Sequence, residues 1–145
     1  MPNRKVPDDH HTARHCTAKD FVTDEMAELN RDAYKPTNDD PDISVSWLEY
    51  HDGDFEARLK AICKDLLGVR RRVRRNHKLA VLQVDWAKKI GKKYGHMLSV
   101  RHNPDGPNES HALIIGIPLL EVRLHQELAD AASENIYSVP LWGER

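Results

Sequence analysis

The sequence has little cysteine and no long apolar run. Only Cys16 and Cys63 occur among its 145 residues, and two cysteines without paired spacing exclude a disulfide framework and a multi-cysteine zinc site. No segment approaches the about 18 to 20 apolar residues of a membrane span, and residues 1–9 lack the apolar core of a secretory signal. We therefore expect a cytoplasmic protein with no membrane contact.

Sequence motifs of several common enzyme classes are missing as well. The chain has no Gly-rich phosphate loop, no Gly-x-Ser-x-Gly elbow and no cysteine cluster. ATP-binding, dinucleotide-binding and serine-hydrolase functions therefore have no support, and we expect no cofactor. The mean hydropathy of -0.69 is low for a globular protein, which indicates large exposed loops or a surface that needs a partner.

The hydrophobic pattern predicts one α+β domain. We expect residues 1–9 to be a flexible lead-in and residues 10–145 to form the domain. Apolar periodicity predicts strands over residues 11–16, 43–50, 79–84, 98–102 and 112–117, and helices over residues 23–34, 55–68, 86–94 and 119–132. The strand at 79–84 is nearly all apolar, which favours burial on both faces. The predicted architecture is a single mixed sheet of about five strands covered by three to four helices.

Charge is strongly segregated along the chain. Residues 1–56 hold 14 acidic and 6 basic residues, residues 57–104 hold 14 basic and 2 acidic ones, and residues 105–145 hold 7 acidic and 2 basic ones. This pattern indicates either a site for an acidic partner or acidic and basic segments that face each other in the fold.

The basic third contains a dense cationic run: Arg70, Arg71, Arg72, Arg74, Arg75 and Lys78. Arginine forks suit phosphates, so these residues are candidates for binding nucleic acid or a phosphate group. No aromatic residues are interleaved with them, which argues against base stacking along the run. The run is explained equally well as a solvated helix end, or as a docking surface for the acidic N-terminal third, as by binding of nucleic acid or phosphate.

A polar cluster begins the predicted domain. Strand alternation places His11, Ala13 and His15 on one face, and Arg14 with Cys16 on the other. Residues four apart on a strand are roughly 13 Å apart, so the two histidines cannot share one ion, and we expect no metal site. Either the histidines bond to the backbone of a partly buried strand, or one acts as an acid or base while Arg14 binds an anion.

Glu49, His102 and His111 are further catalytic candidates. With the two from the polar cluster, the set of catalytic candidates is His11, Arg14, Glu49, His102 and His111. Glu49 shares a strand face with core residues, so its carboxylate needs a partner, for which Arg14 is the obvious candidate. Alternatively, Glu49 acts as a general base. The other two histidines flank a turn-rich loop. They either approach each other to form a phosphate or metal site or end a polar hairpin.

Three short blocks carry a resemblance: His11-x-x-Arg14-x-Cys16, residues 44–49 (SVSWLE) and residues 110–114 (SHALI). They are similar to blocks of an uncharacterised family of small bacterial proteins. The resemblance implies a bacterial source and a place beside other genes in a mobile or defence locus. It implies no activity, because none is settled for that family.

These features lead to one main functional hypothesis and two alternatives. The main one is a non-catalytic interaction module that acts with a protein partner in a bacterial defence or toxin–antitoxin setting. The first alternative is a small enzyme that acts on nucleic acid or a nucleotide through the His/Arg/Glu cluster. The second is a nucleic-acid-binding protein that uses residues 70–78. The sequence leaves the oligomeric state open.

Overall fold

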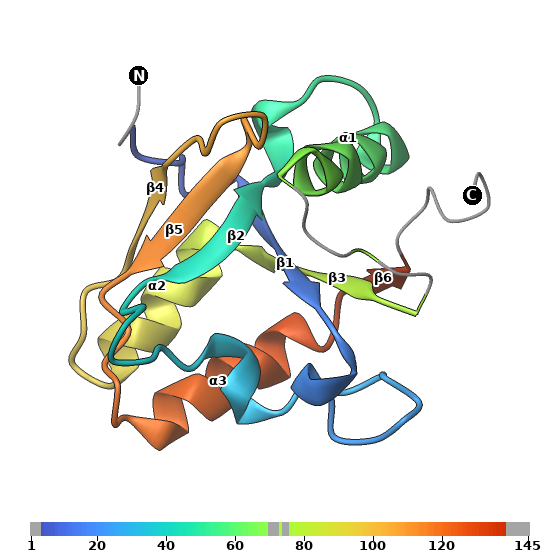
Figure 1. The fold of residues 1–145 in the computed structure, drawn as a ribbon. Helices are drawn as coiled ribbons and strands as arrows, with labels where there is room; N and C mark the ends of the chain where they lie inside the picture. The colour runs from blue at the N-terminus through green and yellow to red at the C-terminus, as the bar shows by residue number, and fades with distance from the viewer. Residues whose placement is uncertain (1–3, 70–72, 74–75, 139–145) are drawn as a thin grey trace.

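The computed structural model describes residues 4–69, 73 and 76–138 (Figure 1). Its strands and helices follow in the order β1 (His11–Cys16), β2 (Ile43–Trp47), α1 (Phe55–Gly68), β3 (Lys78–Gln83), α2 (Val84–Lys93), β4 (Ser99–His102), β5 (His111–Ile115), α3 (Val122–Ala132) and β6 (Ile136–Ser138). Short 3-10 turns lie at η1 (Ala18–Asp20), η2 (Arg31–Tyr34) and η3 (Leu48–Tyr50). Within the described ranges, no helix has the length and apolar character to cross a membrane.

The strands form one sheet in the order β4-β5-β2-β1-β3-β6, and every pairing is antiparallel. The prediction of a single α+β sheet covered by helices is confirmed. The sheet has six strands rather than about five, and its strands do not mix directions. The additional strand is β6, which has only three residues and is too short for alternation to reveal.

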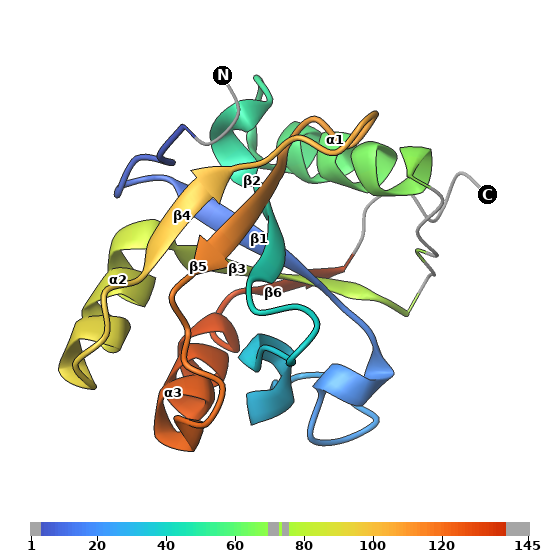
Figure 2. The ribbon, with the colours of Figure 1, turned by 60° about the vertical axis from the view of Figure 1, so that its left-hand side comes forward.

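Helices cover both faces of the sheet. Figure 2 shows α1 on one side and α2 with α3 on the other. Strand alternation fills both layers: Leu79 and Val81 of β3 belong to the core under α1, whereas Ala80 and Leu82 belong to the core with α2 and α3. The predicted burial of β3 on both faces is confirmed, because a strand between two helical layers needs apolar residues at successive positions.

The helix predicted over residues 23–34 is wrong. This segment has a non-helical residue at Met26, with φ of 55°, and regains regular structure only in the short turn η2. Its backbone finds partners elsewhere: the N–H of Leu29 donates to Ser133 Oγ at 2.9 Å and that of Asn30 to Asp20 O at 2.8 Å. The buried Met26, Leu29 and Tyr34 therefore pack as a loop around α3, and tertiary contacts override the local helical pattern.

Residues 4–6, expected as part of a flexible lead-in, run beside β4. Val6 is buried in the core, its N–H donates to Val100 O at 2.9 Å, and Arg4 O accepts from the N–H of His102 at 2.8 Å. The described part of the lead-in is therefore fastened to the edge of the sheet.

Candidate functional site

A histidine–carboxylate pair lies where β1 begins. Glu49, in the turn η3, accepts two hydrogen bonds from His11: one from its backbone N–H to Oε1 at 2.7 Å, and one between its ring Nδ1 and Oε2 at 2.5 Å. The side chain of Glu49 is 14% exposed and that of His11 is 36% exposed. A carboxylate on Nδ1 holds that nitrogen in its N–H form and leaves Nε2 as the basic nitrogen of the neutral ring.

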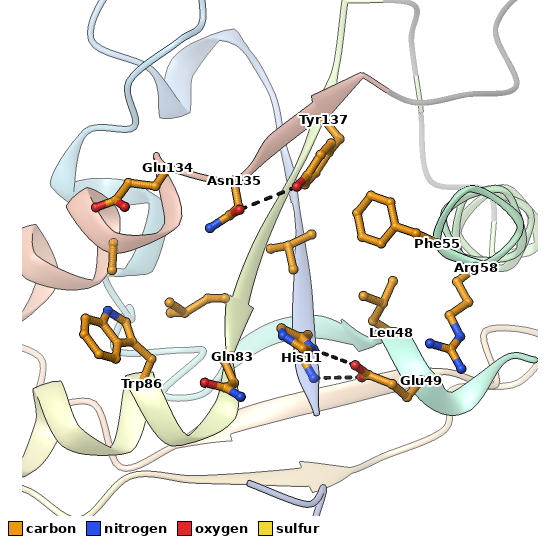
Figure 3. Close-up of a pocket in the computed structure, with 13 residues that line it drawn as sticks. His11, Leu48, Glu49, Phe55, Arg58, Gln83, Trp86, Glu134, Asn135 and Tyr137 are labelled. Atoms are coloured by element: carbon orange, nitrogen blue, oxygen red, sulfur yellow. Dashed lines mark hydrogen bonds and ion pairs between the residues drawn. The ribbon is translucent and has the colours of Figure 1, made fainter. Parts of the chain in front are cut away.

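This pair opens into a cleft of about 450 Å³, which we call the dyad cleft. Its volume is typical of a small-molecule site, for which the range is about 300 to 1,000 Å³. Figure 3 shows Gln83, His11 and Glu49 along one side of the cleft and Asn135, Tyr137 and Phe55 along the other. His11 Nε2 has no hydrogen-bond partner among the residues that the structure describes, so it is available to a bound molecule.

Aromatic rings line the dyad cleft. Trp86, at the first turn of α2, is 52% exposed, and the rings of Phe55 and Tyr137 meet edge to face with centroids 4.7 Å apart. Exposed rings beside a cavity offer flat surfaces on which a planar group can stack. The amides of Gln83 and Asn135 supply donors and acceptors beside these rings.

Arg58 supplies a positive charge to the dyad cleft. Its Nε–H donates to His51 O at 2.9 Å, which fixes the guanidinium on the Glu49 side of the cleft (Figure 3). The terminal nitrogens have no hydrogen-bond partner within the described part of the chain. Their N–H groups can therefore donate to an anionic group.

Arg14 does not pair with Glu49, contrary to our expectation. Its Nε–H donates to Ala33 O at 2.8 Å and its Nη1 to Ser44 O at 2.7 Å, so it joins η2 to β2. It lines a separate cleft of about 650 Å³ whose wall also carries four carboxylates, Asp20, Asp32, Asp40 and Asp42. Lys19 and Lys35 also line this cleft, so its charges nearly cancel and do not select an anion.

The other two histidine candidates lie apart from the dyad cleft and from each other. His102 pairs with Ala112 across the hairpin, not with His111, so the two rings point to opposite faces of the sheet. Each binds a carbonyl: His102 Nε2 lies 2.7 Å from Glu109 O, and His111 Nδ1 lies 2.6 Å from Asn103 O. His111 Nε2 also contacts Ser44 Oγ at 3.1 Å, so both of its nitrogens are engaged.

Most of the cationic run falls where the structure is not described. Arg70, Arg71, Arg72, Arg74 and Arg75 lie outside the described residues. Lys78 lies at the start of β3, where its Nζ donates to Ser138 Oγ at 3.0 Å. No group of three or more metal-ligating side chains is found in residues 4–69, 73 and 76–138.

Sequence reasoning identified His11 and Glu49 separately but missed the rest of the cleft. Phe55, Arg58 and Trp86 lie within predicted helices, and Tyr137 follows the last predicted helix. The position of Trp86 carried a signal, because a large aromatic residue lies between the apolar segment 79–84 and the lysines of residues 88–93. Comparison of the chain with protein-family models, with curated proteins and with solved structures found no match.

Proposed function

We propose that this chain is a small enzyme that cleaves a phosphate ester of a nucleotide or nucleic acid, with His11 as its general base. The observation that carries the proposal is the His11–Glu49 pair at the wall of the dyad cleft, joined at 2.5 Å with His11 Nε2 available. A histidine oriented by a carboxylate and open to a cavity is the arrangement that general-base catalysis requires.

The chemistry follows from this pair and from Arg58. His11 Nε2 takes a proton from a water molecule or a substrate hydroxyl, and the oxygen so activated forms a bond to phosphorus. The bond from phosphorus to the leaving oxygen breaks, and the protonated His11 returns its proton to that oxygen. Glu49 stabilises the imidazolium between these steps, and the guanidinium of Arg58 offsets negative charge on the phosphate oxygens.

The lining of the dyad cleft supports a nucleoside as the neighbouring group. The rings of Phe55, Trp86 and Tyr137 offer stacking surfaces for a base, and the amides of Gln83 and Asn135 match the donors and acceptors on its edge. The proposal includes a cytoplasmic setting, which the two free cysteines, Cys16 and Cys63, support.

The experiment is an activity screen of wild-type protein with nucleoside monophosphates and single-stranded RNA, with products identified by mass spectrometry. For the substrate that is cleaved, His11→Asn should lower kcat by about a hundredfold or more, since a general base contributes roughly 10² to 10⁴. Glu49→Gln should lower kcat by at least about tenfold with little change in KM, because it acts through the orientation and charge of His11.

Matched controls are His96→Asn and Glu28→Gln, which change the same residue types outside the dyad cleft and should retain wild-type rates. The proposal is wrong if no member of the panel is cleaved, or if His11→Asn is as active as the wild type.

The interaction-module hypothesis has a different observation in its favour. Met97 is 95% exposed and Leu120 is 85% exposed. Their loops adjoin, since a Cβ at Gly116 would lie 2.6 Å from Met97 O. Exposed apolar side chains that form one contiguous patch are typical of protein contacts. A pull-down in which Met97→Asp and Leu120→Asp remove a partner captured by the wild type would support this second candidate, whereas equal capture would contradict it.

A further inference from the structure

A second cleft opens on the other side of Glu49. It has a volume of about 340 Å³, and its wall includes Arg4, Lys5, His10 and Tyr50; we call it the N-terminal cleft. Glu49 lines both clefts. His10 lines the N-terminal cleft and the next residue, His11, lines the dyad cleft. The His11–Glu49 pair therefore lies at the boundary between the two clefts.

The N-terminal cleft is cationic. Arg4 and Lys5 are exposed, and neither forms an ion pair with another described residue. The carboxylate in this wall is Glu49, whose two oxygens accept hydrogen bonds from His11. The dyad cleft, by contrast, has one cation, Arg58, against two carboxylates, Glu49 and Glu134. An anionic group is therefore favoured in the N-terminal cleft.

The cationic wall is held in place. The guanidinium of Arg4 stacks over the Trp47 ring at 4.7 Å, and the indole Nε1–H of Trp47 donates to His10 Nδ1 at 2.9 Å. Because Nδ1 of His10 accepts this bond, its proton is on Nε2, which becomes a hydrogen-bond donor. Val6, between these residues, is anchored to β4. The cleft therefore presents donors and positive charge on a fixed backbone.

From the two clefts we infer that the substrate is a single nucleic-acid strand that crosses Glu49, rather than a free mononucleotide. A nucleoside lies in the dyad cleft, where its unpaired base stacks on the aromatic rings. A phosphate further along the strand lies in the N-terminal cleft beside Arg4, Lys5 and His10. This inference rests on the proposed function, because the scissile phosphate must lie next to His11, at the boundary between the two clefts.

The test compares two probes, uridine 5′-monophosphate and a single-stranded RNA octanucleotide, in fluorescence titrations. All proteins carry His11→Asn so that the strand is not cut. In this background the octanucleotide should bind at least about tenfold more tightly than the mononucleotide, since it reaches both clefts. Adding Arg4→Ala and Lys5→Ala should bring the ratio of the two affinities close to one and flatten the salt dependence of octanucleotide binding.

The matched control adds Lys89→Ala and Lys92→Ala, which remove two exposed cations of α2 outside both clefts and should keep the full octanucleotide advantage. Thermal unfolding of each variant checks that the fold is retained. Equal affinities of the His11→Asn protein for the two probes, or an equal loss for both after the Arg4 and Lys5 changes, would overturn the inference and leave the proposed function in place. Failure of both probes to bind would overturn both.

Discussion

The histidines of this chain differ in what they bind. His102, His111 and His125 each place a ring nitrogen 2.6 to 2.7 Å from a backbone carbonyl, so they fasten loops. His11 and His51, by contrast, bind carboxylates. Of these two, His11 lines the dyad cleft. The same side chain therefore serves as a structural hydrogen-bonding group in several places and as a candidate base in one.

The cysteines should be chemically inert in the folded state. Cys16 and Cys63 are fully buried, and burial raises the pKa of both thiols to about 12. The reactive species is the thiolate. Its fraction near pH 8 is then lower than in a free cysteine by about a thousandfold.

We predict that a disulfide reagent such as Ellman's reagent labels neither thiol of the native protein near pH 8 at a measurable rate. In urea, where the pKa of both groups returns to its ordinary value, both should react quickly. Absorbance of the released thiolate measures the two rates. Rapid labelling of the folded protein would contradict the burial of these residues.

The turn η3 determines the position of Glu49, the carboxylate that orients the candidate base His11. β2 ends at Trp47, and the chain then turns so that Leu48 packs under α1 while Glu49 reaches the start of β1. The pairing Thr12↔Trp47 sets this register. A slip of one residue would move Glu49 away from His11, because side chains alternate between the faces of a strand.

Helix α1 is tied to the loop before β5 by a carboxylate. Asp65 Oδ2 lies 2.6 Å from His51 Nε2 and accepts a hydrogen bond from Ser110 Oγ at 2.6 Å. Ser110 is fully buried, so loss of the carboxylate leaves its hydroxyl without that acceptor.

Asp65→Ala should therefore lower the free energy of unfolding by about 2 kcal/mol, the usual cost of an unsatisfied buried partner of a charged group. Urea denaturation measures the change. Asp52→Ala, at an exposed acidic residue nearby, is the control and should stay within about 0.5 kcal/mol of the wild type. A neutral effect of Asp65→Ala would show that the contact contributes nothing to stability.

At the scale of the whole molecule, the two cores share one sheet. Ile62 belongs to the core under α1, and Leu128 to the core with α2 and α3; both are fully buried. Because the strands between the layers contribute to both cores, neither layer can separate without exposing the sheet. Unfolding should therefore be one cooperative transition.

Ile62→Ala and Leu128→Ala should each lower the free energy of unfolding by about 2 to 5 kcal/mol. Far-UV circular dichroism and tryptophan fluorescence should report the same urea midpoint in each variant. Separate midpoints for the two signals in either variant would mean that the layers unfold independently.

The segregated charge is partly neutralised within the fold. Lys88 lies 2.8 Å from Asp8, and Lys93 lies 2.6 Å from Glu127, so the basic third contacts both acidic ends. The hydrogen bond from Lys93, and then that from Tyr94, lowers the pKa of Glu127. These contacts are exposed and contribute little to stability, but they support the interpretation that the chain's acidic and basic segments face each other.

Local patterns were sufficient to predict β1 and most of the other elements to within a few residues, because burial on one or two faces imprints a period on the sequence. The same patterns predicted a helix over residues 23–34, where hydrogen bonds to Asp20 and Ser133 favour a packed loop. Long-range bonds of this kind leave no periodic signal.

The candidate site depends on contacts of the same long-range kind. The residue types of His11 and Glu49 made each of them a candidate. The expected partner of Glu49, however, was Arg14. This pairing was wrong because the sequence contains no information on the direction in which η3 turns. Strand register, the position of α1 and the close approach of β6 bring residues 11, 49, 58, 86 and 137 to one cleft. Such a cleft is assembled from segments that are distant in the chain, so only their packing around the sheet could reveal it.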